Sequence, residues 1–393
     1  MDITKYILTL CTYIIMIIPL HNWNTDLPDI VYEQEFEFVR NKIIIPVEVQ
    51  AREYRFILDT GATNLFSTDL AKEIEYSILS NQDVSDANNV THALPLISLE
   101  GMRISDYSPG TQKGFIVDFS TNKALSCFRI DGIVGSVFFR NCILQIDFQS
   151  KMIRVASNRK DLGLKRKMGL DMYVDPQQNS PVIWIEIGNK NKGRDQVLID
   201  SGMDGFYEMS VKSSGIFKSN GIVEIIESSS GSATIGLFGD GEPVRQKRFM
   251  AQDISLDDIK FSQVIAETTI DNNPRIGVDL LQYGRVSFDW INGKFYFDLM
   301  KSVEDYEAFT WPMSPTIKGD HFLVGTIWDD SLNQTISNGD TIIAIDGTYV
   351  TSENLCSFIY RESLFSERDS LSFIIKDTVG QKHELVIHKR KYA

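Results

Sequence analysis

Two short stretches of the sequence place an aspartate directly after three apolar residues and before a hydroxyl residue and a glycine. The first is FILDTGATNLFS, where the acid is Asp59, and the second is VLIDSGMDGFYEMS, where it is Asp200. Two carboxylates held about 3 Å apart cannot both ionise, so they share one proton. Such a pair can supply a general base and a general acid to one reaction. The pattern therefore indicates hydrolysis by paired carboxylates.

The residues after each aspartate suit a close approach of two backbone segments. Gly61 and Gly202 lack side chains, and glycine permits close packing and unusual backbone angles. Thr60 and Ser201 carry hydroxyls that can hydrogen-bond and fix the two turns. A plain surface turn is the alternative interpretation of one such motif. Two copies, each after an apolar run, favour a paired site.

The chain repeats itself beyond these motifs. ISLEGMRISD at 97–106 matches ISLDDIKFSQ at 254–263, and GIVGSVFFRNCILQIDF at 132–148 matches PRIGVDLLQYGRVSFDW at 274–290. Gly135 aligns with Gly277 in the last of these blocks. Three matches in the same order indicate an internal duplication. The middle block is displaced further than the other two, which indicates an insertion in the second half.

The segments that must carry these motifs are typical of strands. NKIIIPVEVQ, YRFILDT, ILQIDFQSKMIRV and RVSFDWINGKFYF are rich in β-branched and aromatic residues, with Gly, Asn and Asp between them. FQSKM and WINGK stand where hairpin turns belong, and Asn292-Gly293 is a strong turn pair. Only STDLAKEI at 67–74 has helix signals in this part of the chain. We expect an all-β body.

DTGA and DSGM are each followed by an apolar-apolar-glycine element, IVG at 133–135 and RIG at 275–277. These motifs resemble those of the retropepsin and pepsin-type aspartic proteases. Two such halves in one chain, after an export signal and before a PDZ-like tail, resemble the bacterial PDZ-containing aspartyl proteases. The protease resemblance covers about residues 35–300.

This resemblance implies a fold of two retropepsin-like β lobes that form one aspartic-protease cleft. It implies hairpin flaps at about 84–96 and 228–241, the second longer and richer in glycine. It also implies roles for the motif residues: Asp59 and Asp200 as the catalytic pair, Thr60, Gly61, Ser201 and Gly202 as support for the two turns, and Gly135 and Gly277 as cleft-supporting glycines.

Three residues depart from the pattern of the family. Arg275 stands where an apolar residue is usual, Met203 replaces a small residue after the glycine, and Asp204 adds a nearby acid. These features could narrow or disable the site. A catalytically weak or inactive pseudo-protease that binds peptides therefore stays open as an alternative.

The C-terminal part of the chain has a different pattern. The segment at 304–320 carries two prolines and interrupts the strands, so we place a boundary there. VGTIWDDS, ISNGDTIIAIDGTYV and a capped helix from Ser352 to about Leu364 resemble a small α+β PDZ domain. The resemblance implies capture of a C-terminal peptide by the loop KGDHFL, through Gly319, His321, Phe322 and Leu323. The alternative is a domain that only packs on the protease.

The N-terminal residues stand apart from the folded body. YILTLCTYIIMIIPL at 6–20 is continuously apolar but shorter than the roughly 20 residues that span a bilayer. It fits the hydrophobic region of a secretory signal, although no small-x-small cleavage site follows. An uncleaved membrane anchor and a buried strand are the alternatives. We expect an exported bacterial protein, periplasmic or membrane-associated.

The remaining composition gives no sign of a metal or cofactor. Cys127, Cys142 and Cys356 show no zinc spacing, and we interpret them as buried small residues rather than a disulfide framework. The five histidines form no paired cluster. A net charge of −14 argues against a polyanionic partner. We therefore expect no metal, no cofactor and no nucleic acid.

Together these observations predict four regions. They are a signal peptide or N-terminal anchor at 1–24, protease lobes at 25–158 and 159–303, and a PDZ domain at 316–393. The predicted function is an aspartic endopeptidase that acts on peptides or proteins through an activated water, with the PDZ domain assisting recognition of a peptide or partner. The rivals are the pseudo-protease and a membrane-anchored PDZ scaffold.

Overall fold

The computed structural model describes residues 31–165, 168–176, 178–231, 235–270, 273–303, 309–360, 365 and 368–392. The predicted signal or anchor at 1–24 lies outside the described residues. The fold is mostly β, with 53% strand, 14% helix and a six-stranded mixed barrel, which confirms the expected β class. Within the described ranges, no helix is long and apolar enough to cross a membrane.

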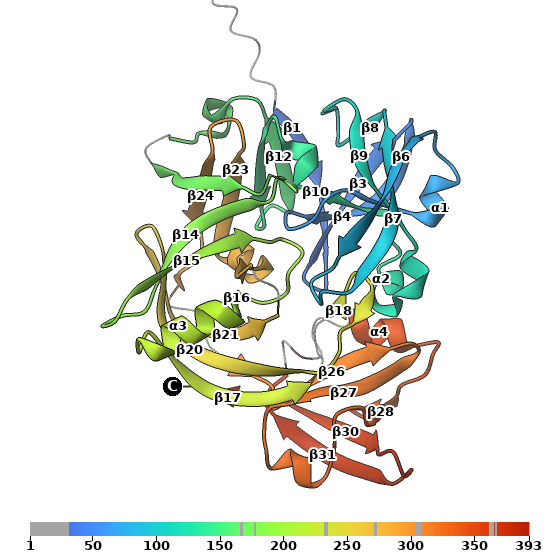
Figure 1. The fold of residues 1–393 in the computed structure, drawn as a ribbon, viewed down its shortest axis with the longest axis vertical. Coiled ribbons are helices and arrows are strands. Elements are labelled where there is room, and N and C mark those ends of the chain that lie inside the picture. Colours follow the sequence, from blue (N-terminus) through green and yellow to red (C-terminus); the bar gives the residue numbers. More distant parts are fainter. Residues whose placement is uncertain are drawn as a thin grey trace, which may run out of the picture.

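The first half, residues 31–158, runs from blue through cyan to green in Figure 1. Its helices are α1 (Thr68–Ala71) and α2 (Lys123–Cys127). Its strands are β1 (Val31–Glu35), β2 (Glu37–Val39), β3 (Lys42–Val49), β4 (Arg52–Asp59), β5 (Leu65–Ser67), β6 (Ser77–Ser85), β7 (Thr91–Leu99), β8 (Met102–Arg103), β9 (Gln112–Val117), β10 (Gly132–Gly135), β11 (Ile143–Asp147) and β12 (Met152–Ala156).

The second half, residues 159–303, runs from green to orange in Figure 1. Its one described α-helix is α3 (Val211–Ser219). Its strands are β13 (Leu170–Val174), β14 (Pro181–Ile187), β15 (Gly193–Ile199), β16 (Tyr207–Ser210), β17 (Val223–Gly231), β18 (Ile235–Gly236), β19 (Gly239–Asp240), β20 (Val244–Leu256), β21 (Ile259–Thr269), β22 (Arg275–Ile276), β23 (Gly284–Asp289) and β24 (Lys294–Leu299).

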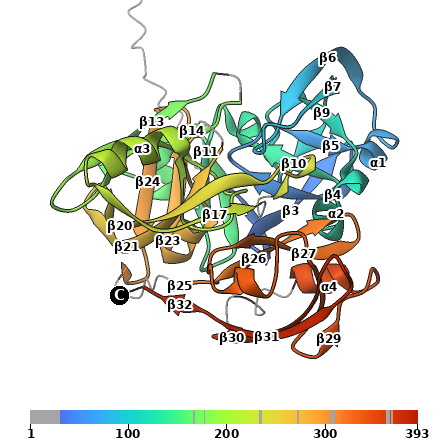
Figure 2. The ribbon, with the colours of Figure 1, turned by 60° about the horizontal axis from the view of Figure 1, so that its bottom comes forward.

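The C-terminal unit, residues 309–392, follows in orange and red. Its helix is α4 (Leu355–Tyr360). Its strands are β25 (Phe309–Thr310), β26 (Met313–Lys318), β27 (His321–Ile327), β28 (Thr341–Ile345), β29 (Thr348–Tyr349), β30 (Ser370–Lys376), β31 (Lys382–His388) and β32 (Arg390–Lys391). Because β32 pairs with β25, the last residues return to the start of the unit (Figure 2).

One continuous antiparallel sheet joins the two halves. Strands β1, β12, β11, β23, β24 and β13 pair in that order. At its centre Gln145 of β11 faces Ser287 of β23, and the Gln145 side chain donates a 3.0 Å hydrogen bond to the Ser287 hydroxyl. These two residues are 142 apart in sequence, the same spacing as Gly135 and Gly277. The sheet therefore pairs the duplicated strands about an approximate two-fold axis.

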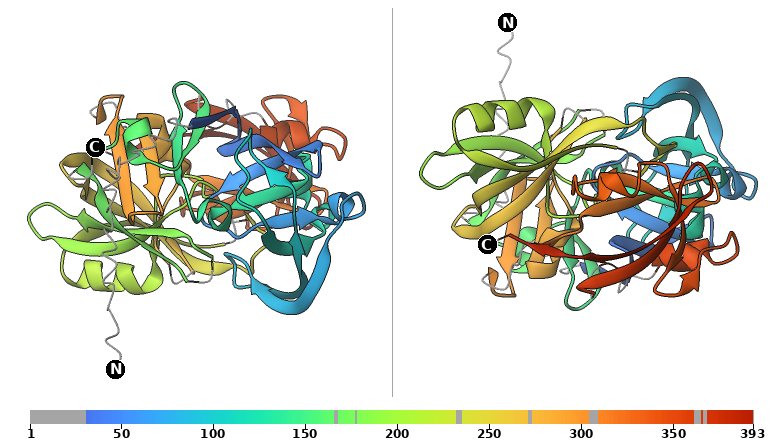
Figure 3. Two further views of the ribbon diagram at one scale, coloured as in Figure 1. Left: turned by 90° about the horizontal axis from the view of Figure 1, so that it is seen from above. Right: turned by 90° about the horizontal axis from the view of Figure 1, so that it is seen from below.

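The first half contributes to two cores because its central strands alternate side chains between two faces. On β4, Phe56 and Leu58 join the core that is shared with the second half. Ile57, between them, joins a separate core with residues of the C-terminal unit such as Phe322 and Ile345. Figure 3 shows the red C-terminal strands lying over the blue strands of the first half. The uninterrupted apolar run before Asp59 is therefore explained by burial on both faces.

The cysteine interpretation was wrong in one respect. Cys127 of α2 and Cys356 of α4 form a disulfide with a Cα–Cα distance of 5.2 Å, and Cys142 is the one free cysteine among the described residues, where it is buried. The partners are 229 residues apart, so their spacing carries no signal of pairing. Packing of the C-terminal unit on the first half brings them together.

The helix predictions were correct for one segment and incomplete for others. Ser67 caps α1 by accepting from the Leu70 amide, and the helix covers only Thr68–Ala71 of the segment 67–74 that carried helix signals. The prediction missed α2 and α3, of which α3 begins at a Ser210 cap. In the C-terminal unit α4 begins at Leu355 rather than at residue 352, and residues 361–364 lie outside the described part.

Candidate active site

The two motif aspartates stand at the ends of equivalent strands. Asp59 is the last residue of β4, which runs parallel to β10 with Gly135 opposite Asp59. Asp200 directly follows β15, which runs parallel to β22, and its amide donates to the Ile276 carbonyl at 2.9 Å. Each acid is thus held where a buried strand enters a turn. The duplication seen in the sequence extends to local strand pairing.

The two turns hold one another by reciprocal hydrogen bonds. The Ser201 hydroxyl accepts from the Thr60 amide at 3.0 Å and donates to the Leu58 carbonyl at 2.9 Å. The Thr60 hydroxyl accepts from the Ser201 amide at 2.9 Å and donates to the Ile199 carbonyl at 2.6 Å. Both hydroxyl residues are buried. Each half therefore completes the backbone hydrogen bonding of the other.

The glycines of the turns lie against the opposite carboxyl groups. A Cβ atom built on Gly61 would lie 2.5 Å from Cγ of Asp200, and one built on Gly202 would lie 2.3 Å from Cγ of Asp59. Real Cβ atoms do not approach other atoms this closely, so any side chain here would displace the carboxyl group. The amides of these glycines donate at 2.9 Å to the aspartate of their own turn. The two acids are brought together as the motifs predicted.

The other two predicted glycines pack behind the turns. A Cβ on Gly135 would lie 2.2 Å from the Ala62 carbonyl oxygen, and a Cβ on Gly277 would lie 2.5 Å from the carbonyl oxygen of Gly205. Met203 fits in this arrangement. Its side chain is buried, and its carbonyl accepts a hydrogen bond from the Val278 amide. The residue that departs from the family pattern therefore leaves the second turn intact.

The environment of Asp59 favours its protonated form. Burial raises the pKa of this carboxyl to about 8, and the negative charge of Asp200 and a hydrogen bond with it act in the same direction. The Gly61 amide and the charge of Lys42 oppose this rise in the pKa. Lys42 itself donates to the Gly202 carbonyl at 2.6 Å and pairs with Asp204 at 2.5 Å. The positive charge of Lys42 thus offsets the negative charge of Asp204.

Asp200 has a different neighbour. The Arg275 side chain is buried, and its Nε lies 3.5 Å from Oδ2 of Asp200. Its Nη1 lies 3.6 Å from Oε2 of Glu208. Burial raises the pKa of Glu208 to about 7, although the Arg275 charge lowers it. The sequence marked Arg275 as unusual, but it gave no indication of the partner Glu208.

The sequence reasoning missed several residues that support the turns. Asn64 is fully buried, and its side-chain oxygen accepts from the Gly135 amide at 3.0 Å. The Ser136 hydroxyl donates to the Thr60 carbonyl at 2.7 Å. The side-chain nitrogen of Asn179 donates to the Ser136 carbonyl at 3.0 Å. The available signal was a polar residue directly before a buried apolar pair, as at Asn64 before Leu65 and Phe66.

The two predicted flap regions form hairpins that touch at their tips. The β6–β7 hairpin turns at 86–90, and the long β17–β20 hairpin contains β18 and β19 near its tip. The Asp86 side chain accepts from the Phe238 amide at 3.0 Å, and Asn88 donates to the Gly239 carbonyl at 3.1 Å. The His92 and Phe238 rings lie 4.5 Å apart. The two hairpins therefore meet, and the second is the longer, as expected.

The predicted peptide loop of the C-terminal unit lies in a tight hairpin. Lys318 pairs with His321 across a two-residue turn that contains Gly319 at a φ of +55°. Phe322 is buried in the core shared with the first half, and Leu323 pairs with Thr316. Asp320 forms a 2.7 Å ion pair with Lys123 of α2. These contacts give the segment a packing role against the first half.

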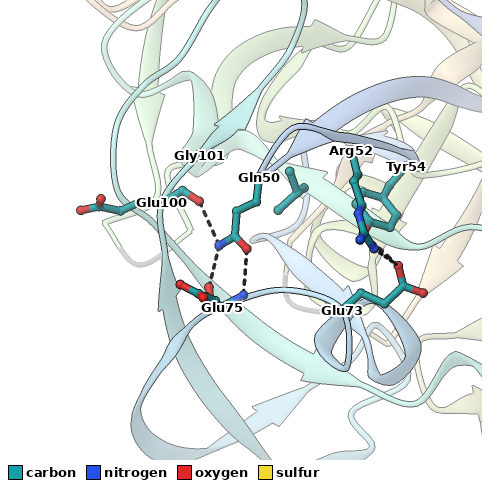
Figure 4. A pocket seen from close by; sticks show the side chains of 8 residues that line it. Gln50, Arg52, Tyr54, Glu73, Glu75, Glu100 and Gly101 are labelled. Atoms are coloured by element: carbon teal, nitrogen blue, oxygen red, sulfur yellow. Dashed lines mark hydrogen bonds and ion pairs between the residues drawn. The ribbon is translucent and has the colours of Figure 1, made fainter.

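Two further features of the described residues can be compared with this site. A shallow polar hollow lies away from the aspartates, and Figure 4 shows that its side chains bond to one another, with Gln50 donating to the Glu75 carbonyl at 2.7 Å and Arg52 pairing with Glu73 at 3.3 Å. A search of the described residues finds no cluster of His, Cys, Asp and Glu that could hold a metal ion.

Comparison with known proteins adds no family to these observations. No protein-family model matches the chain, and no curated protein matches it in sequence.

Proposed function

We propose that this protein is an aspartic endopeptidase in which Asp59 and Asp200 activate a water molecule against a peptide bond. The observation that carries the proposal is the crossed contact at the two turns. Each motif glycine touches the carboxyl group of the other half, and each motif hydroxyl bonds to backbone of the other half. A pair of unrelated surface turns would have no reason to interlock in this way.

The chemistry follows from the shared environment of the two carboxyl groups. Mutual repulsion and burial favour one proton for the pair, and the raised pKa of Asp59 agrees with that state. The ionised partner takes a proton from water as the water oxygen attacks the carbonyl carbon. The protonated partner donates to the carbonyl oxygen. Both groups are fixed by strands and by the Gly61 and Gly202 amides, so little reorganisation is needed.

The wider architecture supports the same proposal. We interpret the two halves as retropepsin-like lobes, because equivalent strands deliver the aspartates and the duplicated strands pair about a common axis. The hairpins that meet through Asp86 and Phe238 would be the flaps over a peptide substrate. The Cys127–Cys356 disulfide supports an oxidising compartment, and hence export.

The proposal is tested by incubating the purified protein with a mixture of peptides at several values between about pH 3 and about pH 8, the range over which carboxyl pairs work as catalysts. Mass spectrometry of the products should show cleavage at internal peptide bonds. Asp59→Asn and Asp200→Asn should abolish the cleavage, and EDTA should leave it unchanged. Cleavage that persists in both variants would exclude the proposed pair.

One observation favours a second candidate, a peptide-binding protein without catalysis. The Arg275 guanidinium lies 3.5 Å from Asp200 and adds a charge that a symmetric pair lacks. A purely structural ion pair would leave a cleft that binds peptides but does not cut them. Peptide binding by the intact protein, measured by calorimetry with no cleavage at any pH tested, would favour this candidate.

A further inference from the structure

The position of Arg275 breaks the approximate symmetry of the site. Arg275 lies on β22 between β15 and β16, with Leu198 opposite it on one side and Glu208 on the other. Its side chain reaches both Asp200 and Glu208, at 3.5 and 3.6 Å. Only 9% of Arg275 is exposed, so this charge is placed inside the protein next to one aspartate of the pair.

The first half makes the same turn without any charge. Ile133 on β10 occupies the position equivalent to Arg275, because each stands two residues before the glycine of its half, Gly135 or Gly277. Ile133 lies between Ile57 and Leu65. Ile133 and both of these neighbours are buried and apolar. The strand geometry therefore does not require an arginine. The Arg275–Glu208 pair stands where the first half has an apolar pair, and it places a positive charge beside Asp200.

The effect of Arg275 follows from its fixed charge. Arginine is not deprotonated in proteins, and a positive charge within about 4–6 Å favours the ionised form of a carboxyl group. Among the other charged groups, Asp59 at the end of β4 acts on Asp200 directly, because the two carboxyl groups repel each other when both are ionised. The remaining charged groups are Glu208 on β16, Glu267 on β21, and the Lys42–Asp204 pair beside the second turn.

We propose that Arg275 is a positioning residue that keeps Asp200 as the ionised partner and leaves the shared proton on Asp59. This inference rests on the proposed function and assigns the two roles within it. Asp200 is the base toward water, and Asp59 is the acid toward the carbonyl oxygen. Burial of Asp59, which favours its neutral form, agrees with this assignment.

The proton transfers balance over one turnover. Asp200 takes a proton from water while the water oxygen bonds to the carbonyl carbon, and Asp59 gives its proton to the carbonyl oxygen. The resulting tetrahedral diol then loses its amine: the carbon–nitrogen bond breaks as the nitrogen takes the proton from Asp200. Asp59 recovers a proton from one hydroxyl of the diol. The pair returns to its starting state with Asp200 ionised and Asp59 protonated.

The test replaces the charged pair with the apolar pair of the first half. Arg275→Ile combined with Glu208→Leu recreates the Ile133–Leu65 contact, so that Glu208 is not left as a buried charge without Arg275. The acidic limb of the pH profile of kcat/KM should shift to a higher pH by about 1 to 3 units, because Asp200 is protonated more readily once the positive charge of Arg275 is removed. Glu208→Leu alone keeps Arg275 and should leave that limb at or below its original pH. Arg275→Lys should retain most of the original profile.

A second readout separates this inference from the proposed function. The ¹³C shift of the Asp200 carboxyl, assigned by its absence in Asp200→Asn, can be followed with pH whether or not the protein cuts peptides. Its midpoint should be higher in the double variant than in the original protein. An unchanged midpoint and an unchanged acidic limb in a folded double variant would overturn the role of Arg275. Absence of cleavage by the original protein would instead overturn the proposed function.

Discussion

The strands that end at Asp59 and Asp200 have equivalent geometry but different surroundings. In the first half the second face of β4 and β10 carries Ile57 and Ile133, which share a core with the C-terminal unit. In the second half the same positions hold Leu198 and Arg275, and Arg275 pairs with charged groups. The backbone turns have stayed alike while the electrostatic environment has diverged. Two nearly symmetric carboxyl groups can therefore have unequal roles.

The largest expected effect comes from removing either acid of the pair. Asp59→Asn and Asp200→Asn should each reduce kcat/KM by about a thousandfold or more, because neither carboxyl works without the other. The double variant should be little worse than either single one. Asp171→Asn, which changes an exposed acid paired with Lys294, is the matched control. Full activity of Asp200→Asn beside an inactive Asp59→Asn would refute the shared pair.

The second largest effect is expected from enlarging Gly61 and Gly202, each of which lies against the aspartate of the other half. Gly61→Ala should disturb Asp200, and Gly202→Ala should disturb Asp59, because the new Cβ atoms would lie 2.5 and 2.3 Å from the opposite Cγ. Each should reduce kcat by about a hundredfold and lower the free energy of unfolding by about 1–3 kcal/mol.

The control for the glycine variants is Gly215→Ala on α3. A Cβ at Gly215 would meet no atom within 4 Å, and alanine is the better helix former, so stability should rise slightly. Activity assays and thermal melts measure both quantities. Unchanged activity in Gly61→Ala would show that the close approach is not needed for catalysis.

A smaller effect is expected from the hydroxyl groups that join the halves. Thr60→Val should leave the Ser201 amide and the Ile199 carbonyl unpaired in a buried site, and Ser201→Ala should do the same to the Thr60 amide and the Leu58 carbonyl. Each change should lower the free energy of unfolding by about 1–3 kcal/mol in denaturant titrations. Thr60→Ser keeps the hydroxyl and should cost clearly less. Equal losses for Val and Ser would point to packing rather than hydrogen bonding.

The last expected effect, which concerns stability alone, is a dependence of the free energy of unfolding on pH. The folded pKa of Asp59 is raised to about 8, above its unfolded value near 4, so the folded state holds a proton that the unfolded state has lost between these values. Stability from this group is therefore fully present below about pH 4 and falls as pH rises toward 8, by up to about 1.4 kcal/mol per pH unit. Glu208 adds to the fall up to its raised pKa of about 7.

Asp59→Asn should flatten this fall, and Glu208→Gln should flatten only the part below about pH 7. Denaturant melts at a series of pH values measure both slopes. A slope unchanged by Asp59→Asn would mean that this carboxyl titrates alike in the folded and unfolded chain, and the environments of the two aspartates would then differ less than we infer.

The parts of the site that were predictable from sequence are those set by local motifs. Asp59 and Gly61 lie within three residues of each other, and their duplication made the partner motif recognisable. The contact between Arg275 and Glu208 depends instead on the antiparallel register of β22 and β16, which no spacing in the sequence specifies. The Cys127–Cys356 bond depends on how the C-terminal unit packs.

Similar reasoning explains the missed helix α3. Its segment VKSSGIFKS contains a glycine and a β-branched first residue, so its helix propensity is weak, and only the Ser210 cap marks its start. In contrast, the hairpin turn at Gly293 was predictable because the turn conformation there, with a φ of +61°, favours the Asn-Gly sequence.

The reciprocal bonds between Thr60 and Ser201 also have a consequence in time. The two residues are 141 positions apart, so at typical rates of synthesis the ribosome adds the second on the order of ten seconds after the first. Until then the first turn lacks the hydroxyl that bonds to the Thr60 amide, and Asp59 has no partner acid. Cys356 is made later still. A nascent chain therefore carries only half of the proposed site, and the interlocked turns exist only once both halves have been made and have docked.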